Sequence, residues 1–205
     1  MAPGVRRPVR VGGASGGFSD RVRAIASLAK NEEVDVIVGD WLSEMTMTIH
    51  GSGKQRELGA IAGKTLSFEE QLQHAMFAEN FMDCFEPAID DLHKNGVKLV
   101  VNAGASDTEI LAKLVLQRCQ ERGWDAKVAW IEGDEQTDTV RQMISEGETF
   151  QSLMHGRKIQ DWEQDIICAQ CYLGGLGMAE ALKQGADIVI AGRVADAAPT
   201  IAAAA

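Results

Sequence analysis

Short apolar runs alternate along the chain with longer segments of helical periodicity. Five runs cover residues 9–11, 34–38, 97–101, 126–131 and 188–191. Their length and β-branched content are typical of buried strands, and helical patterns follow several of them. A regular alternation of this kind is typical of a parallel sheet covered by helices. The pattern therefore predicts an α/β fold with a mainly parallel sheet, helices on both faces and a Rossmann-like layered architecture.

Other segments give a less regular signal. Residues 41–49 fit a strand or a helix equally well. Residues 67–94 have a helical pattern that is interrupted near Pro87, which indicates two helices or one kinked helix. Residues 135–170 are polar and weakly helical, so an excursion outside the core is expected there. No repeat or low-complexity segment is found.

The length and the chain's last residues bear on domain organisation. With 205 residues the chain fits one domain, predicted at 9–205 after a flexible N-terminal segment at 1–8. The final residues 202–205 are four alanines, which favour a helix, and no glycine, asparagine or proline stops them. The chain is therefore expected to be the N-terminal part of a longer protein.

Composition excludes several classes of protein. The formal net charge of −10 and an aromatic content of 5% disfavour nucleic acid, which binds basic surfaces and stacks on aromatic rings. No uninterrupted apolar stretch is long enough to cross a membrane, and a cytoplasmic location is expected. The four cysteines form no disulfide framework. Cys168 and Cys171 have CxxC spacing but lack the strand, helix or second pair typical of a redox or zinc site, so they are predicted to be small buried residues.

Glycine, carboxylate, amide and guanidinium groups follow the predicted strands. In an open α/β sheet, ligands bind outside the carboxyl ends of the strands, and glycine lets the backbone approach them. The candidate ligand-binding residues are Gly12, Gly13, Ser15, Gly16, Asn102, Gly104 and Arg193, and the candidate catalytic residues are Asp40, Glu44, Glu132, Asp134 and Asp196. Helix capping and internal ion pairs are the alternative explanation for each loop taken alone. Because five loops share this composition, we expect them to meet at one site.

The chemistry expected at this site is proton transfer or anion binding. The carboxylates suit acid–base work or a hard cation, and Arg193 suits a carboxylate, a phosphate or a thioester-linked phosphate. Glu132 and Asp134 flank Gly133 after a strand, so they are predicted to converge, with repulsion raising one pKa. The four histidines are spaced too irregularly for a metal site, so no metal ligand is assigned and the cofactor is left open.

The first glycine loop matches no nucleotide motif. Ala14 stands where GxGxxG read from Gly12 needs its second glycine, and Phe18 stands where a P-loop needs lysine. Residues 59–65 are one residue short of a P-loop and follow no strand. Residues 13–17 match the nucleophile pattern GxSxG, but no accompanying histidine and aspartate can be identified.

Six ordered motifs together resemble the acyclic terpene utilisation protein AtuA family. They are VGGASG at 11–16, DWLSEMTM at 40–47, NAG at 102–104, EGD at 132–134, YLG at 172–174 and GRVAD at 192–196. The resemblance runs from about residue 9 to the end. It departs at Gly17-Phe18-Ser19, where a bulky residue is expected after Gly16.

The resemblance implies a role in the catabolism of acyclic terpenes or in related metabolism. The expected function is an enzyme, a lyase or a hydrolase, acting on a small branched or polyketide-like acyl substrate such as an acyl-CoA by hydration, dehydration or hydrolysis. The alternative is a non-catalytic ligand-binding or assembly domain that serves an acyl-CoA carboxylase. A homo-oligomer and a carboxylase partner both remain open.

Overall fold

Five parallel strands form the central sheet in the computed structural model, which describes residues 7–15, 21–31 and 33–205. They are β1 (Val11–Ser15), β2 (Val36–Gly39), β3 (Lys98–Val101), β4 (Val128–Ile131) and β5 (Ile188–Ala191). Their order across the sheet is β1-β2-β3-β5-β4, and every neighbouring pair is parallel. The predicted α/β class is therefore confirmed.

The first strand differs from its prediction. The apolar run at 9–11 was expected to stop at Gly12, whereas β1 continues through Ser15. Its small residues pair in parallel with β2, Gly12 with Ile37 and Gly13 with Val38. Hydrogen bonds from the neighbouring strand outweigh the poor strand propensity of glycine. The first two candidate glycines therefore lie within the strand and not in the loop after it.

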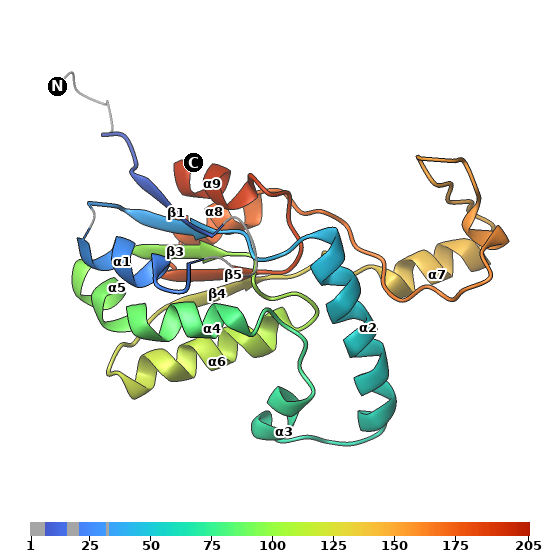
Figure 1. Cartoon of the computed structure of the whole chain (residues 1–205), viewed down its shortest axis with the longest axis horizontal. Helices are drawn as coiled ribbons and strands as arrows, with labels where there is room; N and C mark the ends of the chain where they lie inside the picture. The colour runs from blue at the N-terminus through green and yellow to red at the C-terminus, as the bar shows by residue number, and fades with distance from the viewer. Residues whose placement is uncertain (1–6, 16–20, 32) are drawn as a thin grey trace.

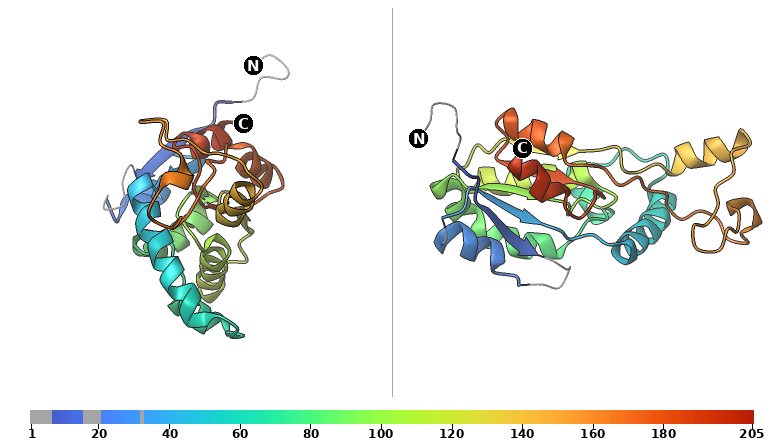
Figure 2. Two further views of the ribbon diagram at one scale, coloured as in Figure 1. Left: turned by 90° about the vertical axis from the view of Figure 1, so that its right-hand side faces the viewer. Right: turned by 90° about the horizontal axis from the view of Figure 1, so that it is seen from above.

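Helices cover both faces of the sheet (Figures 1 and 2). One face carries α1 (Ala24–Asn31), α4 (Asn80–Phe85), α5 (Ile89–Asn95) and α6 (Thr108–Glu121), and the other carries α8 (Leu176–Lys183) and α9 (Ala198–Ala204). Each face has its own buried apolar cluster. On the first, the Phe81 ring stacks on Phe85 and meets Trp41 edge-on, with centroids 5.5 and 5.2 Å apart. Burial of both sheet faces explains the continuous apolar runs in the sequence.

The remaining helices lie beyond the sheet or on its margin. They are α2 (Glu44–Ile61), α3 (Phe68–Gln73), α7 (Thr137–Ser145) and the 3₁₀ turns η1 (Glu86–Ala88) and η2 (Ile159–Asp161). The ambiguous segment 41–49 is thus mostly helical, and Ser43 with Thr46 forms a capping box at its start. The interruption predicted near Pro87 is η1. In the described part of the chain, no helix is long and apolar enough to span a bilayer.

The strand order places a topological switch point at the carboxyl ends of β3 and β5. β3 and β5 are neighbours, but the chain leaves β3 toward α6 on one face and leaves β5 toward α9 on the other. Two neighbouring strands whose continuations diverge in this way form a topological switch point, where open α/β sheets bind ligands. Asn102 and Arg193 follow these two strands, and α2 extends outward from the same edge (Figure 1).

Candidate functional site

Asp40 and Asn102 meet after β2 and β3. The Asn102 side chain is fully buried; its amide nitrogen donates to the Asp40 carboxylate at 2.5 Å, and its Oδ1 accepts from the Trp41 backbone N–H at 2.6 Å. The Ser15 hydroxyl donates to the Asp40 carbonyl at 3.4 Å. A buried amide that both donates and accepts fixes the relative position of two strand ends. Asn102 therefore positions the loop that leads into α2.

A tight turn follows Asn102. The Gly104 N–H donates to the Ala191 carbonyl at 2.9 Å, which joins the ends of β3 and β5. A Cβ on Gly104 would lie 2.8 Å from the Cβ of Thr108, so α6 can start here only beside a glycine. Ala105 has a positive φ of 45°, a conformation that costs about 1 kcal/mol or more for a residue other than glycine. The local strain lies next to the switch point.

Arg193 is the central cation of the site. Its guanidinium is buried and donates to the Val194 carbonyl at 2.7 Å, to Asp196 Oδ1 at 2.9 Å and to Glu44 Oε1 at 3.2 Å. The guanidinium carbon lies 4.2 Å from the centroid of the Tyr172 ring, a cation–π distance. The buried Nε has no hydrogen-bond partner among the described residues. Two carboxylates therefore face one guanidinium.

Glu44 and Tyr172 form a second contact beside Arg193. The Tyr172 hydroxyl donates to Glu44 Oε1. This hydrogen bond, together with the Glu44 backbone N–H and Arg193, lowers the pKa of the Glu44 carboxyl to about 2. The same bond raises the pKa of the Tyr172 hydroxyl. The pair therefore consists of a neutral phenol and a carboxylate that stays ionised over the physiological range of pH.

The Asp134 carboxylate binds the backbone of Arg193. Asp134 Oδ2 accepts from the Arg193 N–H at 2.6 Å, and only 4% of the residue is exposed. A Cβ on Gly192 would lie 2.6 Å from the Asp134 Cγ, so glycine is required there. Burial is the main cause that raises the pKa of the Asp134 carboxyl, and nearby Glu135 adds to it. Asp134 thus ties the end of β4 to the end of β5.

Glu132 does not share these contacts. Its side chain is exposed and accepts from the Trp130 indole N–H at 3.1 Å. The prediction that repulsion from Glu132 raises the pKa of Asp134 is therefore wrong, because burial is the leading cause and the nearby like charge is that of Glu135. Gly133 between them has a φ of 113°, which lets the chain turn the two side chains toward different neighbours.

A small hollow of about 170 Å³ opens beside these groups. It is lined by Glu44, Met47, Thr48, Cys168, Gln170, Tyr172 and Arg193. The hollow lies between the first turns of α2 and the segment that leads from α7 to α8. A larger molecule would have to extend out of it along α2.

A family model for the acyclic terpene utilisation family protein AtuA matches residues 9–205. The chain belongs to this family. No curated protein and no solved structure matches it significantly. The AtuA resemblance found in the sequence motifs is therefore confirmed, and four of its motifs supply the side chains gathered around Arg193.

The AtuA-family chain brings some of the predicted site residues into contact with one another. Around the switch point these are Asp40 with Asn102, and Glu44, Asp134 and Asp196 with Arg193. Gly12 packs against α1, and a Cβ on Gly13 would meet nothing within 4 Å. Gly16 lies outside the described residues. Whether any of these residues is catalytic stays a prediction.

Sequence reasoning missed the role of Tyr172 and the walls of the hollow. Tyr172 belongs to a family motif, but no local pattern in the sequence links it to Glu44. Cys168 and Gln170 lie in the polar segment 135–170, which the sequence predicts to be an excursion outside the core. Within the described ranges, no three His, Cys, Asp or Glu side chains are grouped so that they could hold a metal ion.

Proposed function

We propose that the chain is an enzyme that binds a small branched acyl substrate, as a thioester, and changes it by hydration, dehydration or hydrolysis. The observation that carries this proposal is the buried Arg193 guanidinium, stacked on Tyr172 and bonded to Glu44 at the switch point of the sheet. All three reactions need a carbonyl to be polarised and a proton to be moved beside it.

Charge around Arg193 favours an uncharged carbonyl over a free acid. Glu44 and Asp196 both contact the guanidinium, so the three groups together carry a formal charge of about −1 at neutral pH. A free carboxylate would have to displace one of them, whereas a carbonyl oxygen needs only a donor. Tyr172 and Arg193 are the donors available. This balance supports a thioester or ester as the bound form.

Proton transfer is assigned to the Glu44 and Tyr172 pair. To donate to a substrate oxygen, the Tyr172 hydroxyl would turn its proton away from Glu44, and the Arg193 guanidinium would stabilise the phenolate left behind. A pKa of about 2 makes Glu44 a weak base on its own. The pair is therefore proposed to work as a unit, and Asp134 is proposed to hold Arg193 in position.

The test is turnover of a panel of short branched acyl thioesters, including acyl-CoAs, by the purified full-length protein. Glu44→Gln and Tyr172→Phe remove the charge and the hydroxyl from exposed side chains, so both variants should fold. We expect turnover to fall at least about a hundredfold in each, the usual scale for loss of an acid–base group. Gln184→Leu, an exposed change at the end of α8, is the matched control.

One result would contradict the roles assigned to Glu44 and Tyr172, and another would contradict the enzyme assignment itself. Equal turnover in wild type and both variants would remove Glu44 and Tyr172 from the reaction. No turnover of any thioester, together with stable co-purification of a carboxylase subunit, would favour the non-catalytic assembly domain instead.

A further inference from the structure

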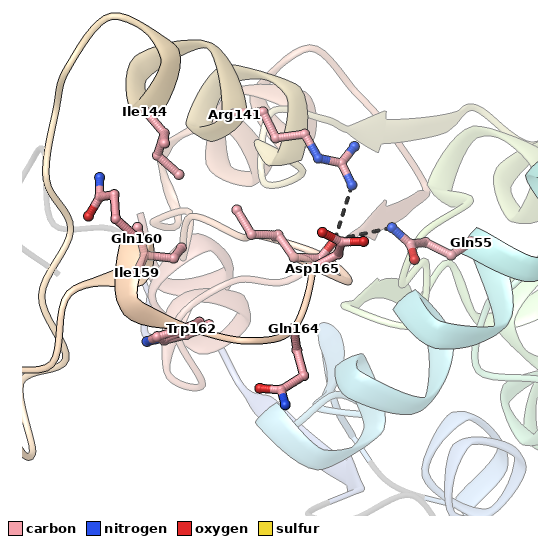
Figure 3. Close-up of a pocket in the computed structure, with 9 residues that line it drawn as sticks. Gln55, Arg141, Ile144, Ile159, Gln160, Trp162, Gln164 and Asp165 are labelled. Atoms are coloured by element: carbon pink, nitrogen blue, oxygen red, sulfur yellow. Dashed lines mark hydrogen bonds between the residues drawn. The ribbon is translucent and has the colours of Figure 1, made fainter.

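Three hollows that share lining residues lead outward from Arg193; the first two follow α2, and the third touches it at Gln55 and lies mainly against α7 and residues 159–166. The hollow of about 170 Å³ shares Cys168 and Gln170 with the next, of about 260 Å³. That one shares Gln55 and Arg141 with a third, of about 380 Å³ (Figure 3). From the start of α2 to Gln55 the helix rises by roughly 16 Å, at 1.5 Å per residue. We call these three hollows together the α2 groove.

The far wall of the α2 groove is held in place by α2 and α7. The side-chain amide of Gln55 and the guanidinium of Arg141 both donate to the Ile166 carbonyl, at 3.1 and 3.0 Å (Figure 3). Nearer the sheet, a Cβ on Gly51 would lie 2.6 Å from the Cys168 sulfur, so the helix and this wall are in close contact. Hydrogen bonds and close packing therefore connect α2, α7 and residues 166–168, which form the walls of the groove.

Side-chain amides recur along the α2 groove. They belong to Gln170, Gln55, Gln164 and Gln160, from the end near Arg193 outward. In the part of the chain that the structure describes, the side chains of Gln164 and Gln170 make no hydrogen bond. A primary amide presents a donor and an acceptor together, which matches an amide of a bound molecule. The lining therefore fits a linear ligand that carries amide groups.

The outer hollow adds apolar and cationic groups. Ile144, Ile159 and Trp162 line it and can contact methylene groups. The exposed cations Arg157 and Lys158 directly precede Ile159 in the chain. Arg141 and Asp165 line the hollow itself, while Arg157 and Lys158 are neighbours in sequence of a lining residue and offer two cations for a phosphate.

We propose that the α2 groove binds the pantetheine-type arm of a thioester substrate. The thioester lies at Arg193, the two amides of the arm lie against the glutamines, and a terminal phosphate lies near Arg157 and Lys158. This inference rests on the proposed function, since it assigns the thioester to the same site. The inference adds a binding site for the arm of the substrate, at a distance from the reacting carbonyl.

The test uses the whole chain and two probes that carry no acyl group, pantetheine and phosphopantetheine. Calorimetric titration should show that both bind wild-type protein and that phosphopantetheine binds more tightly. Gln164→Leu and Gln170→Leu should each weaken binding of both probes about tenfold, the loss of one net hydrogen bond. Replacing Arg157 and Lys158 together by alanine should remove the advantage of phosphopantetheine only. Gln184→Leu should bind as wild type does.

A substrate without the arm separates this inference from the proposed function. If wild type turns over the S-methyl thioester of isovaleric acid but binds neither pantetheine nor phosphopantetheine, the arm site is overturned and the proposed function stands. If no thioester of any kind is bound or turned over, both proposals fail. Binding of pantetheine that is unchanged in Gln164→Leu and Gln170→Leu also overturns the arm site.

Discussion

Substituting Gly192 by alanine tests the packing that holds Arg193 in place. The added Cβ would lie 2.6 Å from the Asp134 Cγ and closer still to both carboxylate oxygens. Real Cβ atoms do not approach so closely, so the buried carboxylate must move. It would then lose the hydrogen bond that it accepts from the Arg193 N–H at 2.6 Å. The backbone N–H of Arg193 would be left buried without a partner.

The expected cost follows from this loss. A hydrogen bond to a charged group contributes about 1.5–3 kcal/mol, and an unpaired buried donor adds a penalty of similar size. We therefore expect Gly192→Ala to lower the free energy of unfolding by about 2–4 kcal/mol, measured by urea denaturation with circular dichroism. Gly13→Ala is the matched control, because a Cβ there would meet nothing within 4 Å. It should be neutral or slightly stabilising, since alanine loses less backbone entropy than glycine.

A double-mutant cycle identifies the clashing partner. If the Asp134 carboxylate is the obstacle, Gly192→Ala should cost much less in a protein that already carries Asp134→Ala. A Gly192→Ala cost below about 0.5 kcal/mol, or the same cost in both backgrounds, would refute the reasoning about this contact.

Two further predictions concern titration. Because burial raises the pKa of Asp134, the stability contributed by its protonated form is present at low pH and is lost as the pH rises through the raised pKa. The free energy of unfolding of wild type, relative to that of Asp134→Asn, should therefore fall as the pH rises above about 4. Urea denaturation at several pH values would show this fall. A constant difference would contradict this. Tyr172→Phe removes the hydrogen bond that mainly lowers the pKa of Glu44, so carboxyl NMR should show the Glu44 pKa rising from about 2 toward its ordinary value; an unchanged pKa would leave Arg193 as the dominant partner.

The sequence by itself determined the sheet and the edge where the site lies. The apolar run of β5 at 188–191 coincides with the observed strand, and the run at 97–101 contains β3, because a strand buried on both faces needs apolar side chains throughout. The residues after these strands, Asn102 and Arg193, were therefore chosen correctly as residues at the carboxyl ends. Family motifs pointed to the same positions.

Only the tertiary structure decided which polar groups meet. Arg193 contacts Glu44 across 149 positions of sequence, and Tyr172 contacts Glu44 across 128. Asp134 and Glu132, two residues apart, have different partners because Gly133 turns the chain between them. The hydrophobic periodicity of a segment indicates which of its side chains are buried, and this can be read from the segment alone. The partners of a polar side chain depend on strand order and on the direction each connection takes, which are fixed only when the whole sheet packs.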